Sequence, residues 1–156
     1  MSDAEITRRI DEEERLVFDS FSNERALELG LELLETAKAR GVAVTIDIRR
    51  GEQQLFHYAM TGTSPNNDRW VRRKAAVVTL FHKSSYHVGQ EVAAKGDDFE
   101  LRQRLNPADY AAHGGSFPIT VRGTGVVGTI TVSGLPQRED HELVIETLER
   151  YLADGR

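Results

Sequence analysis

The 156-residue sequence contains no cysteine. Disulfide bonds, cysteine-ligated zinc, thiolate-ligated haem and iron–sulfur clusters are therefore excluded, because each requires cysteine sulfur. A metal ion would have to be held by histidine, carboxylate or backbone oxygen. No apolar run approaches the roughly 20 residues that span a bilayer, and residues 1–10 lack the apolar stretch of a secretion signal. We therefore expect a cytoplasmic protein without membrane contact.

The sequence also lacks an excess of positive charge, since its formal net charge is −5. Nonspecific binding to nucleic acid depends on a dense cationic surface, so we expect no nucleic-acid partner. Walker-type, HExxH, GxSxG and strand-linked GxGxxG motifs are missing, and with them the common signatures of nucleotide-binding and hydrolytic enzymes. The balance of 39% hydrophobic and 29% charged residues is typical of a globular chain, and the length predicts one domain over residues 1–156.

Hydrophobic periodicity predicts helices in four places and two hairpins. A charged segment with a loose apolar stripe, within residues 1–20, is expected to form a peripheral helix. Further helices are predicted at 23–40, 68–82 and 136–152, and strands at 42–49, 54–60, 117–121 and 126–133. Residues 84–110 are expected to be the least regular part. Two hairpins between helices favour an α+β fold, in which helices pack on the faces of an antiparallel sheet.

A histidine followed by two glycines, His113-Gly114-Gly115, precedes the third predicted strand. The glycines let backbone amides come close to a ligand, and a neutral imidazole beside them could ligate a metal or haem iron, or act as an acid or base. We name His113 as the best single candidate for function and as the candidate metal ligand. The alternative is a tight turn, in which the glycines only permit chain reversal. The other four histidines lie in predicted strands, helices or caps.

A second candidate is the run NDRWVRRK at residues 67–74, near the start of a predicted helix. It places an acid, Asp68, before the cations Arg72, Arg73 and Lys74, which follow one turn later. This arrangement could receive a carboxylate or a propionate, so all four residues are candidate contacts for a small anionic ligand. The alternative is structural, with Asp68 capping the helix and pairing with Arg72 four residues on. The only tryptophan, inside this run, is expected in the core or at a subunit interface.

Four runs of the sequence carry a resemblance to a known family. They are residues 67–74, 84–86, 110–119 and 128–141, the last of which ends in SGLPQREDH. They resemble bacterial and fungal haem-degrading domain proteins, grouped with the HbpS-like or GlcG-like proteins, from about residue 19 to 152. The resemblance implies an antiparallel sheet with helices on its faces, comparable to profilin-like architecture. It also implies a homo-oligomer, with the chain itself as partner, and haem or another tetrapyrrole as ligand.

Three functions are compatible with these features. The first is a tetrapyrrole-binding or haem-degrading protein, with His113 as iron ligand and residues 72–74 as partners of the propionates. The second is a non-enzymatic oligomeric scaffold or adaptor, suggested by the missing catalytic motifs and the broad apolar helix faces. A third is an enzyme that uses Asp68, His113 and Asp140. A Soret band that appears on addition of hemin would separate the first function from the second.

Overall fold

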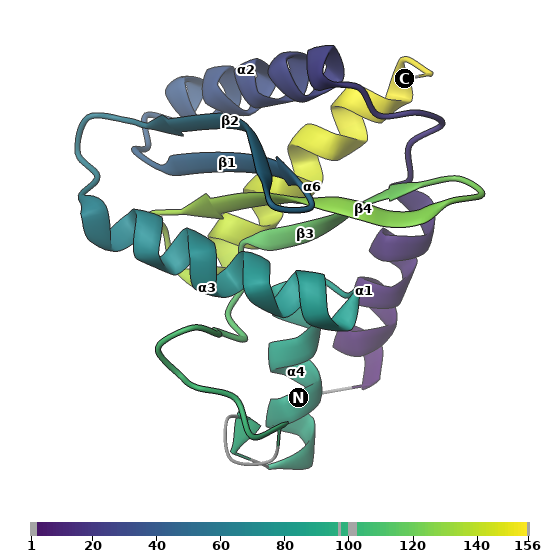
Figure 1. Cartoon of the computed structure of the whole chain (residues 1–156), viewed down its shortest axis with the longest axis vertical. Helices are drawn as coiled ribbons and strands as arrows, with labels where there is room; N and C mark the ends of the chain where they lie inside the picture. Colours follow the sequence, from purple (N-terminus) through teal and green to yellow (C-terminus); the bar gives the residue numbers. More distant parts are fainter. Residues whose placement is uncertain (1–2, 97, 100–102, 156) are drawn as a thin grey trace.

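The computed structural model describes residues 3–96, 98–99 and 103–155. Its helices are α1 (Asp3–Arg15), α2 (Asn23–Ala39), α3 (Pro65–Phe81), α4 (Ser85–Lys95) and α6 (Gln137–Ala153), and its strands are β1 (Thr45–Arg50), β2 (Gln53–Ala59), β3 (Ser116–Val121) and β4 (Gly125–Ser133). The sheet forms a middle layer, with α2 and α6 on one side and α3 on the other (Figure 1). Among the described residues, no helix is long and apolar enough to cross a membrane.

The two hairpins join side by side into one sheet. The strand order is β2-β1-β4-β3, and every neighbouring pair is antiparallel. In the central pair of β1 and β4, Ile46 lies opposite Val132 and Ile48 lies opposite Ile130. β2 and β3 are the edge strands. The predicted α+β fold, an antiparallel sheet of two hairpins with helices on its faces, is confirmed.

The face of the sheet toward α2 and α6 is apolar and forms the main core. Strand residues alternate between faces, so Ile46, Ile48, Ile130 and Val132 all point to this side. They pack with buried leucines of the two helices, which are Leu29, Leu33, Leu143 and Leu148. Each such side chain contributes about 1.5–3 kcal/mol when it is fully buried. This layer therefore stabilises the sheet and leaves its opposite face for polar groups.

The face toward α3 is polar although it is buried. Its buried polar strand residues, each at most 3% exposed, are Thr45, Asp47, Thr129, Thr131 and Ser133. α3 covers this face and adds a buried lysine, Lys74, to the layer. Buried polar groups require hydrogen-bond partners. The position of α3 on this face is therefore fixed by specific polar contacts as well as by the surface area that it buries. The candidate ligand pocket lies at one end of this layer.

Two boundaries differ from the prediction because of capping contacts. α3 begins at Pro65 rather than at residue 68, since the Asn67 side chain accepts a hydrogen bond from the Ser64 N–H group at 3.0 Å. Proline is favourable in a first helical turn, which has no partner for its N–H group. The predicted irregular segment, residues 84–110, contains α4, which begins after a Ser84 cap on the His87 N–H group. Residues 97 and 100–102 of that segment lie outside the described residues.

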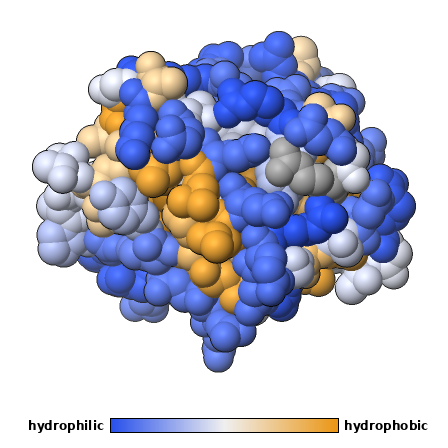
Figure 2. Space-filling view, turned by 90° about the horizontal axis from the view of Figure 1, so that it is seen from above, coloured by the Kyte–Doolittle hydropathy of each residue, from blue (hydrophilic) through white to orange (hydrophobic). Residues whose placement is uncertain are grey.

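α2 leaves part of its surface apolar on the outside of the molecule. Leu27 and Leu31 are 52% and 48% exposed, and the nearby edge strand β2 carries Tyr58 at 46%. Figure 2 looks down on the side where α2 lies and shows an apolar strip that crosses this face between hydrophilic residues. Scattered exposed leucines are common, but a continuous strip beside an unpaired strand edge is typical of an interaction surface.

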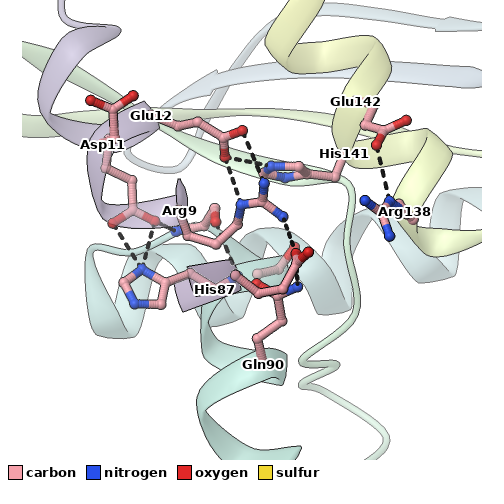
Figure 3. A network of polar contacts seen from close by, with 12 residues as sticks. Arg9, Asp11, Glu12, His87, Gln90, Arg138, His141 and Glu142 are labelled. Atoms are coloured by element: carbon pink, nitrogen blue, oxygen red, sulfur yellow. Dashed lines mark hydrogen bonds and ion pairs between the residues drawn. The ribbon is translucent and has the colours of Figure 1, made fainter. Parts of the chain in front are cut away.

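α1 is attached to the rest of the fold through charged side chains. Its buried residues are Arg9 and Glu12, and neither of its isoleucines is buried. Glu12 Oε1 lies 2.9 Å from His141 Nε2 of α6 and 2.8 Å from Arg9 Nε, as Figure 3 shows. A second contact joins Glu13 Oε2 to His87 Nδ1 of α4 at 2.9 Å. The N-terminal helix thus docks by a buried polar network, whereas the sequence suggested an apolar stripe; it ends at Arg15, five residues earlier than predicted.

Candidate ligand pocket

A pocket of about 400 Å³ lies between α3, the loop before β3 and the turn from β4 to α6. Its volume is within the range of sites that take small organic ligands. Most of its lining is polar or aromatic, and the residues are Asn66, Asn67, Trp70, Lys74, His113, Ser133, Gly134, Leu135, Gln137 and Asp140. Three segments that are far apart in the sequence therefore build one site.

One face of α3 supplies a wall of the pocket. Asn67, Trp70 and Lys74 are spaced by three and four residues, which places their side chains on the same side of a helix. The Trp70 ring meets the His113 ring edge to face, with centroids 5.3 Å apart and an angle of 75° between the planes. This geometry is favourable for aromatic pairs. The two rings therefore hold each other at the same wall, and His113 is exposed to solvent there.

A buried ion pair forms another part of the wall. Lys74 Nζ lies 2.9 Å from Asp140 Oδ2 and donates to the Val132 carbonyl oxygen at 3.1 Å. Asp140 Oδ1 accepts the Leu135 N–H group at 2.9 Å, and both charged side chains are at most 4% exposed. Burial lowers the pKa of Lys74, although Asp140 opposes this change. Burial also raises the pKa of Asp140, against the opposing effects of Lys74 and of backbone N–H groups.

Both glycines beside His113 are closely packed, and Gly115 leaves room for Lys74. Gly115 has φ of +138°, and a Cβ atom there would lie 2.7 Å from Lys74 Nζ and would collide with the Val132 carbonyl oxygen. A Cβ atom on Gly114 would collide with the Gln137 carbonyl oxygen. The Gly114 N–H group donates to Gln137 Oε1 at 3.0 Å, so it is already engaged within the fold. Both glycines are therefore required by close packing, and each lies against a residue that lines the pocket, Gln137 for Gly114 and Lys74 for Gly115.

The cations of residues 72–74 do not form one surface. Lys74 faces the pocket, and Arg73 lies over the Trp70 ring with its Cζ atom 4.5 Å from the centroid. Arg72 is exposed and lines a separate groove together with Arg49. Adjacent helical residues are about 100° apart around the axis, so three in succession point to different sides. Of the three, Lys74 alone is part of the pocket lining.

Asp68 contacts His57 instead of Arg72. Its Oδ1 atom lies 2.7 Å from His57 Nε2, and His57 Nδ1 lies 2.8 Å from Oδ2 of the fully buried Asp47. Arg49 donates to the other oxygen of Asp47 at 2.8 Å. The expected pair between Asp68 and Arg72 is thus replaced by a link from α3 to the strand edge. Asp68 does not line the pocket, unlike the other two acid–base candidates, His113 and Asp140.

Comparison with known proteins identifies the family of the chain. A family model described as "Haem degrading protein HbpS-like" matches residues 21–149, which is most of the sequence. The chain belongs to the HbpS-like family. The resemblance inferred from the four sequence runs is therefore confirmed, and α1 lies before the residues that the family model matches.

Relatives of this HbpS-like chain are similar over nearly their whole length. A "UPF0303 protein" of Streptomyces coelicolor is 54% identical over 144 residues, which are 92% of this chain and 91% of that protein. A crystal structure of the Ybr137w protein matches with a TM-score of 0.90 and 28% identity, covering 99% of this chain and 91% of the other. A crystal structure of a "PduOC:Heme Complex" matches with a TM-score of 0.69 and 17% identity over 86% and 95% of the two chains, a likeness that shows the fold alone.

Sequence reasoning missed much of the lining in this HbpS-like chain. Ser133 and Gln137 were not singled out, although both lie in a run that carries the family resemblance. Trp70, expected in the core or at an interface, is partly exposed in the pocket wall. The spacing of Asn67, Trp70 and Lys74 on one helix face was the signal that could have found this wall. Asp140 of α6 was named from the sequence, but its meeting with Lys74 and Ser133 depends on how the sheet is assembled.

Proposed function

We propose that the chain binds a tetrapyrrole of the haem class in this pocket, with His113 as the iron ligand. The observation that carries the proposal is the position of His113, an exposed imidazole that lies against Trp70 in the wall of a pocket of about 400 Å³. An imidazole can serve as an axial haem ligand, and an aromatic wall suits a flat ring. The description of the family and the haem complex of a structural neighbour support the same ligand.

The donor set of the chain fits this ligand better than a metal ion held by protein alone. Within residues 3–96, 98–99 and 103–155, no group of three or more histidine and acidic side chains is placed to hold a metal ion. A haem iron needs one or two protein ligands, because the macrocycle supplies the other four. Arg73 over Trp70 and the amine of Lys74 are the nearest cations for propionate groups.

A titration with hemin tests this function. Wild-type protein is expected to develop a saturable Soret band, and His113→Ala is expected to weaken hemin binding about tenfold, which is a loss of about 1.4 kcal/mol. The matched control is His82→Asn, at the end of α3. His82 is also exposed, and its positive φ of 56° is one that asparagine accepts. Equal hemin affinity and identical spectra of wild type and His113→Ala would exclude this ligand assignment.

A non-enzymatic oligomeric scaffold is the second candidate function, and the apolar strip on α2 favours it. The exposed Leu27 and Leu31 lie beside β2, an edge strand whose outer backbone groups have no strand partner in the described sheet. A second copy of the chain could cover both features in a two-fold symmetric contact. We expect this homo-oligomer whether or not the pocket binds haem.

The cysteine-free composition also supports our proposal of a cytoplasmic protein.

Light scattering tests the oligomer. The wild type is expected to have a mass that is a multiple of the 17.5 kDa chain, and Leu31→Lys is expected to shift it toward the monomer. Leu80→Lys is the matched control, because Leu80 is 51% exposed but belongs to α3 on the other side of the sheet. A wild-type mass of 17.5 kDa at micromolar concentration would refute the oligomer.

A further inference from the structure

Lys74 lines the pocket, although the residue is only 3% exposed. The Val132 carbonyl oxygen and Asp140 Oδ2 are acceptors for its amine, at 3.1 and 2.9 Å. An ammonium group has three N–H donors, so these acceptors account for two of them. The sequence has four lysines, and Lys74 is the one that both lines this pocket and pairs with a buried carboxylate.

The surroundings of the pair favour its uncharged form more than water does. Burial lowers the pKa of Lys74 and raises the pKa of Asp140. Both changes reduce the free energy needed to move a proton from Nζ to the carboxylate 2.9 Å away. The product of that transfer is a neutral amine beside a carboxylic acid. A neutral amine is the nucleophilic form of lysine, and desolvation is a common way to obtain it.

We propose that Lys74 is a nucleophile that condenses with an aldehyde or ketone in the pocket, with Asp140 as its proton acceptor and donor. This activity goes beyond haem binding and does not depend on it. The proposal stands on geometry, because Lys74 and Asp140 both line the pocket and their amine and carboxylate lie 2.9 Å apart.

The condensation balances with the groups present. The Lys74 ammonium gives one proton to Asp140, and the Nζ lone pair then forms a C–N bond to the carbonyl carbon. The electrons of the C=O π bond move to oxygen, which takes up the proton that the nitrogen loses. Asp140 returns its proton to the resulting hydroxyl group, which leaves as water while the C=N bond forms. The Lys74 ammonium and the carbonyl compound thus give a protonated imine and one water, Asp140 is again a carboxylate, and no oxidant or reductant is needed.

The lining indicates the class of carbonyl compound. Lys74 and Asp140 are its oppositely charged groups, and they pair with each other, so a carbonyl compound needs no charge of its own to bind there. Trp70 supplies an aromatic surface, and Asn66, Asn67 and Gln137 carry amide groups that can donate and accept hydrogen bonds. A neutral aldehyde or ketone with a flat ring and polar substituents suits this combination.

Reductive trapping tests the proposal on the wild-type protein. The intact chain is incubated at about pH 6.5 with 4-hydroxybenzaldehyde and sodium cyanoborohydride, and modified lysines are located by peptide mass spectrometry. Lys38, Lys83 and Lys95 serve as internal controls on the same molecule, because they are more exposed. We expect several-fold more adduct at Lys74 than at Lys95, since burial beside Asp140 favours the neutral, nucleophilic amine.

A variant completes the test. Lys74→Arg keeps a cation and hydrogen-bond donors but cannot form an imine under these conditions, so the preferred adduct should disappear. Modification of Lys74 no faster than that of Lys95, or an unchanged adduct yield in Lys74→Arg, would overturn the proposal. Hemin is absent from these experiments, so their outcome is separate from that of the hemin titration.

Discussion

His141 Nε2 lies 2.9 Å from Glu12 Oε1, and both side chains are buried although 129 positions separate them in the chain. A carboxylate only accepts hydrogen bonds, so His141 donates through Nε2–H. His141 Nδ1 is buried with no hydrogen-bond partner among the described residues. Burial lowers the pKa of His141, although Glu12 opposes this change. The contact therefore joins a neutral imidazole to an ionised carboxylate.

Acidification should weaken this contact and the folded state with it. Because the folded pKa of His141 is lowered, its contribution to stability is present above the ordinary value of 6.5 and decreases as the pH falls below it. Burial alone would raise the pKa of Glu12, but His141 and Arg9 lower it, so its contribution is present above 4.5 and lost below. We expect the free energy of unfolding in urea to fall from about pH 6.5 downward. In a His141→Gln variant, the free energy of unfolding should fall less steeply between pH 7 and pH 5. An equal slope in the wild type and the variant would contradict the role given to His141.

Removing the Glu12 carboxylate should destabilise the fold more than its position on a peripheral helix suggests. In Glu12→Ala, the buried Arg9 loses its closer carboxylate and keeps the Glu5 carboxylate at 3.8 Å, while His141 loses its acceptor, so we expect a loss of about 3 kcal/mol in the free energy of unfolding. The matched control is Glu14→Ala on the same helix, which is exposed and should change stability by about 0.5 kcal/mol or less. Equal urea midpoints of the two variants would show that the network contributes little.

This contact also shows what the sequence could predict. α2, the two hairpins and the helix after residue 136 follow from local periodicity, because their apolar faces meet the core directly. α1 was expected to pack through a loose apolar stripe, and the structure buries Arg9 and Glu12 instead. The partner of Glu12 is on α6, and no local pattern reports a contact between the two ends of a chain. A buried charge therefore looked like a solvated one.

In the candidate site, too, some residues were predicted from local sequence patterns and others depend on tertiary structure. His113 and Lys74 were named from the sequence, because a glycine-flanked histidine and a basic run stand out locally. Their neighbourhood depends on tertiary structure, since Asp140 reaches Lys74 through the turn from β4 to α6. Arg72 and Asp68 were named for the same ligand and lie elsewhere, because helical rotation and a histidine from β2 direct them away.

Gly115 should resist substitution for two separable reasons. In Gly115→Ala, a positive φ of +138° strains the backbone, and the new Cβ atom would lie 2.7 Å from Lys74 Nζ. Gly123→Ala is the matched control, because Gly123 has φ of +80° but no atom within 4 Å of its Cβ position. We expect about 1 kcal/mol of destabilisation in the control and about 2–4 kcal/mol in Gly115→Ala. Similar urea midpoints for the two variants would show that the Lys74 side chain moves aside at no measurable cost in stability. The larger Gly114→Val and Gly115→Val replacements should destabilise at least as much.

The pair of Lys74 and Asp140 should be strongly non-additive in a double-mutant cycle. Lys74→Met leaves a buried carboxylate without its cation, and Asp140→Asn leaves a buried ammonium while keeping an acceptor for the Leu135 N–H group. We expect each single variant to lose about 3–5 kcal/mol of unfolding free energy, and the double variant to lose less than the sum by at least about 2 kcal/mol.

A surface pair on the same chain provides the control cycle. Lys83 Nζ lies 3.1 Å from Glu91 Oε1, close to the distance in the buried pair, but the two side chains are 43% and 30% exposed. The cycle of Lys83→Met and Glu91→Gln should therefore give a coupling below about 1 kcal/mol, because water screens the charges and replaces lost contacts. Couplings of the same size in the two cycles would mean that the Lys74 amine is better solvated than its burial indicates. That result would also weaken the argument that this amine loses its proton easily, so the two cycles bear directly on the chemistry proposed for the pocket.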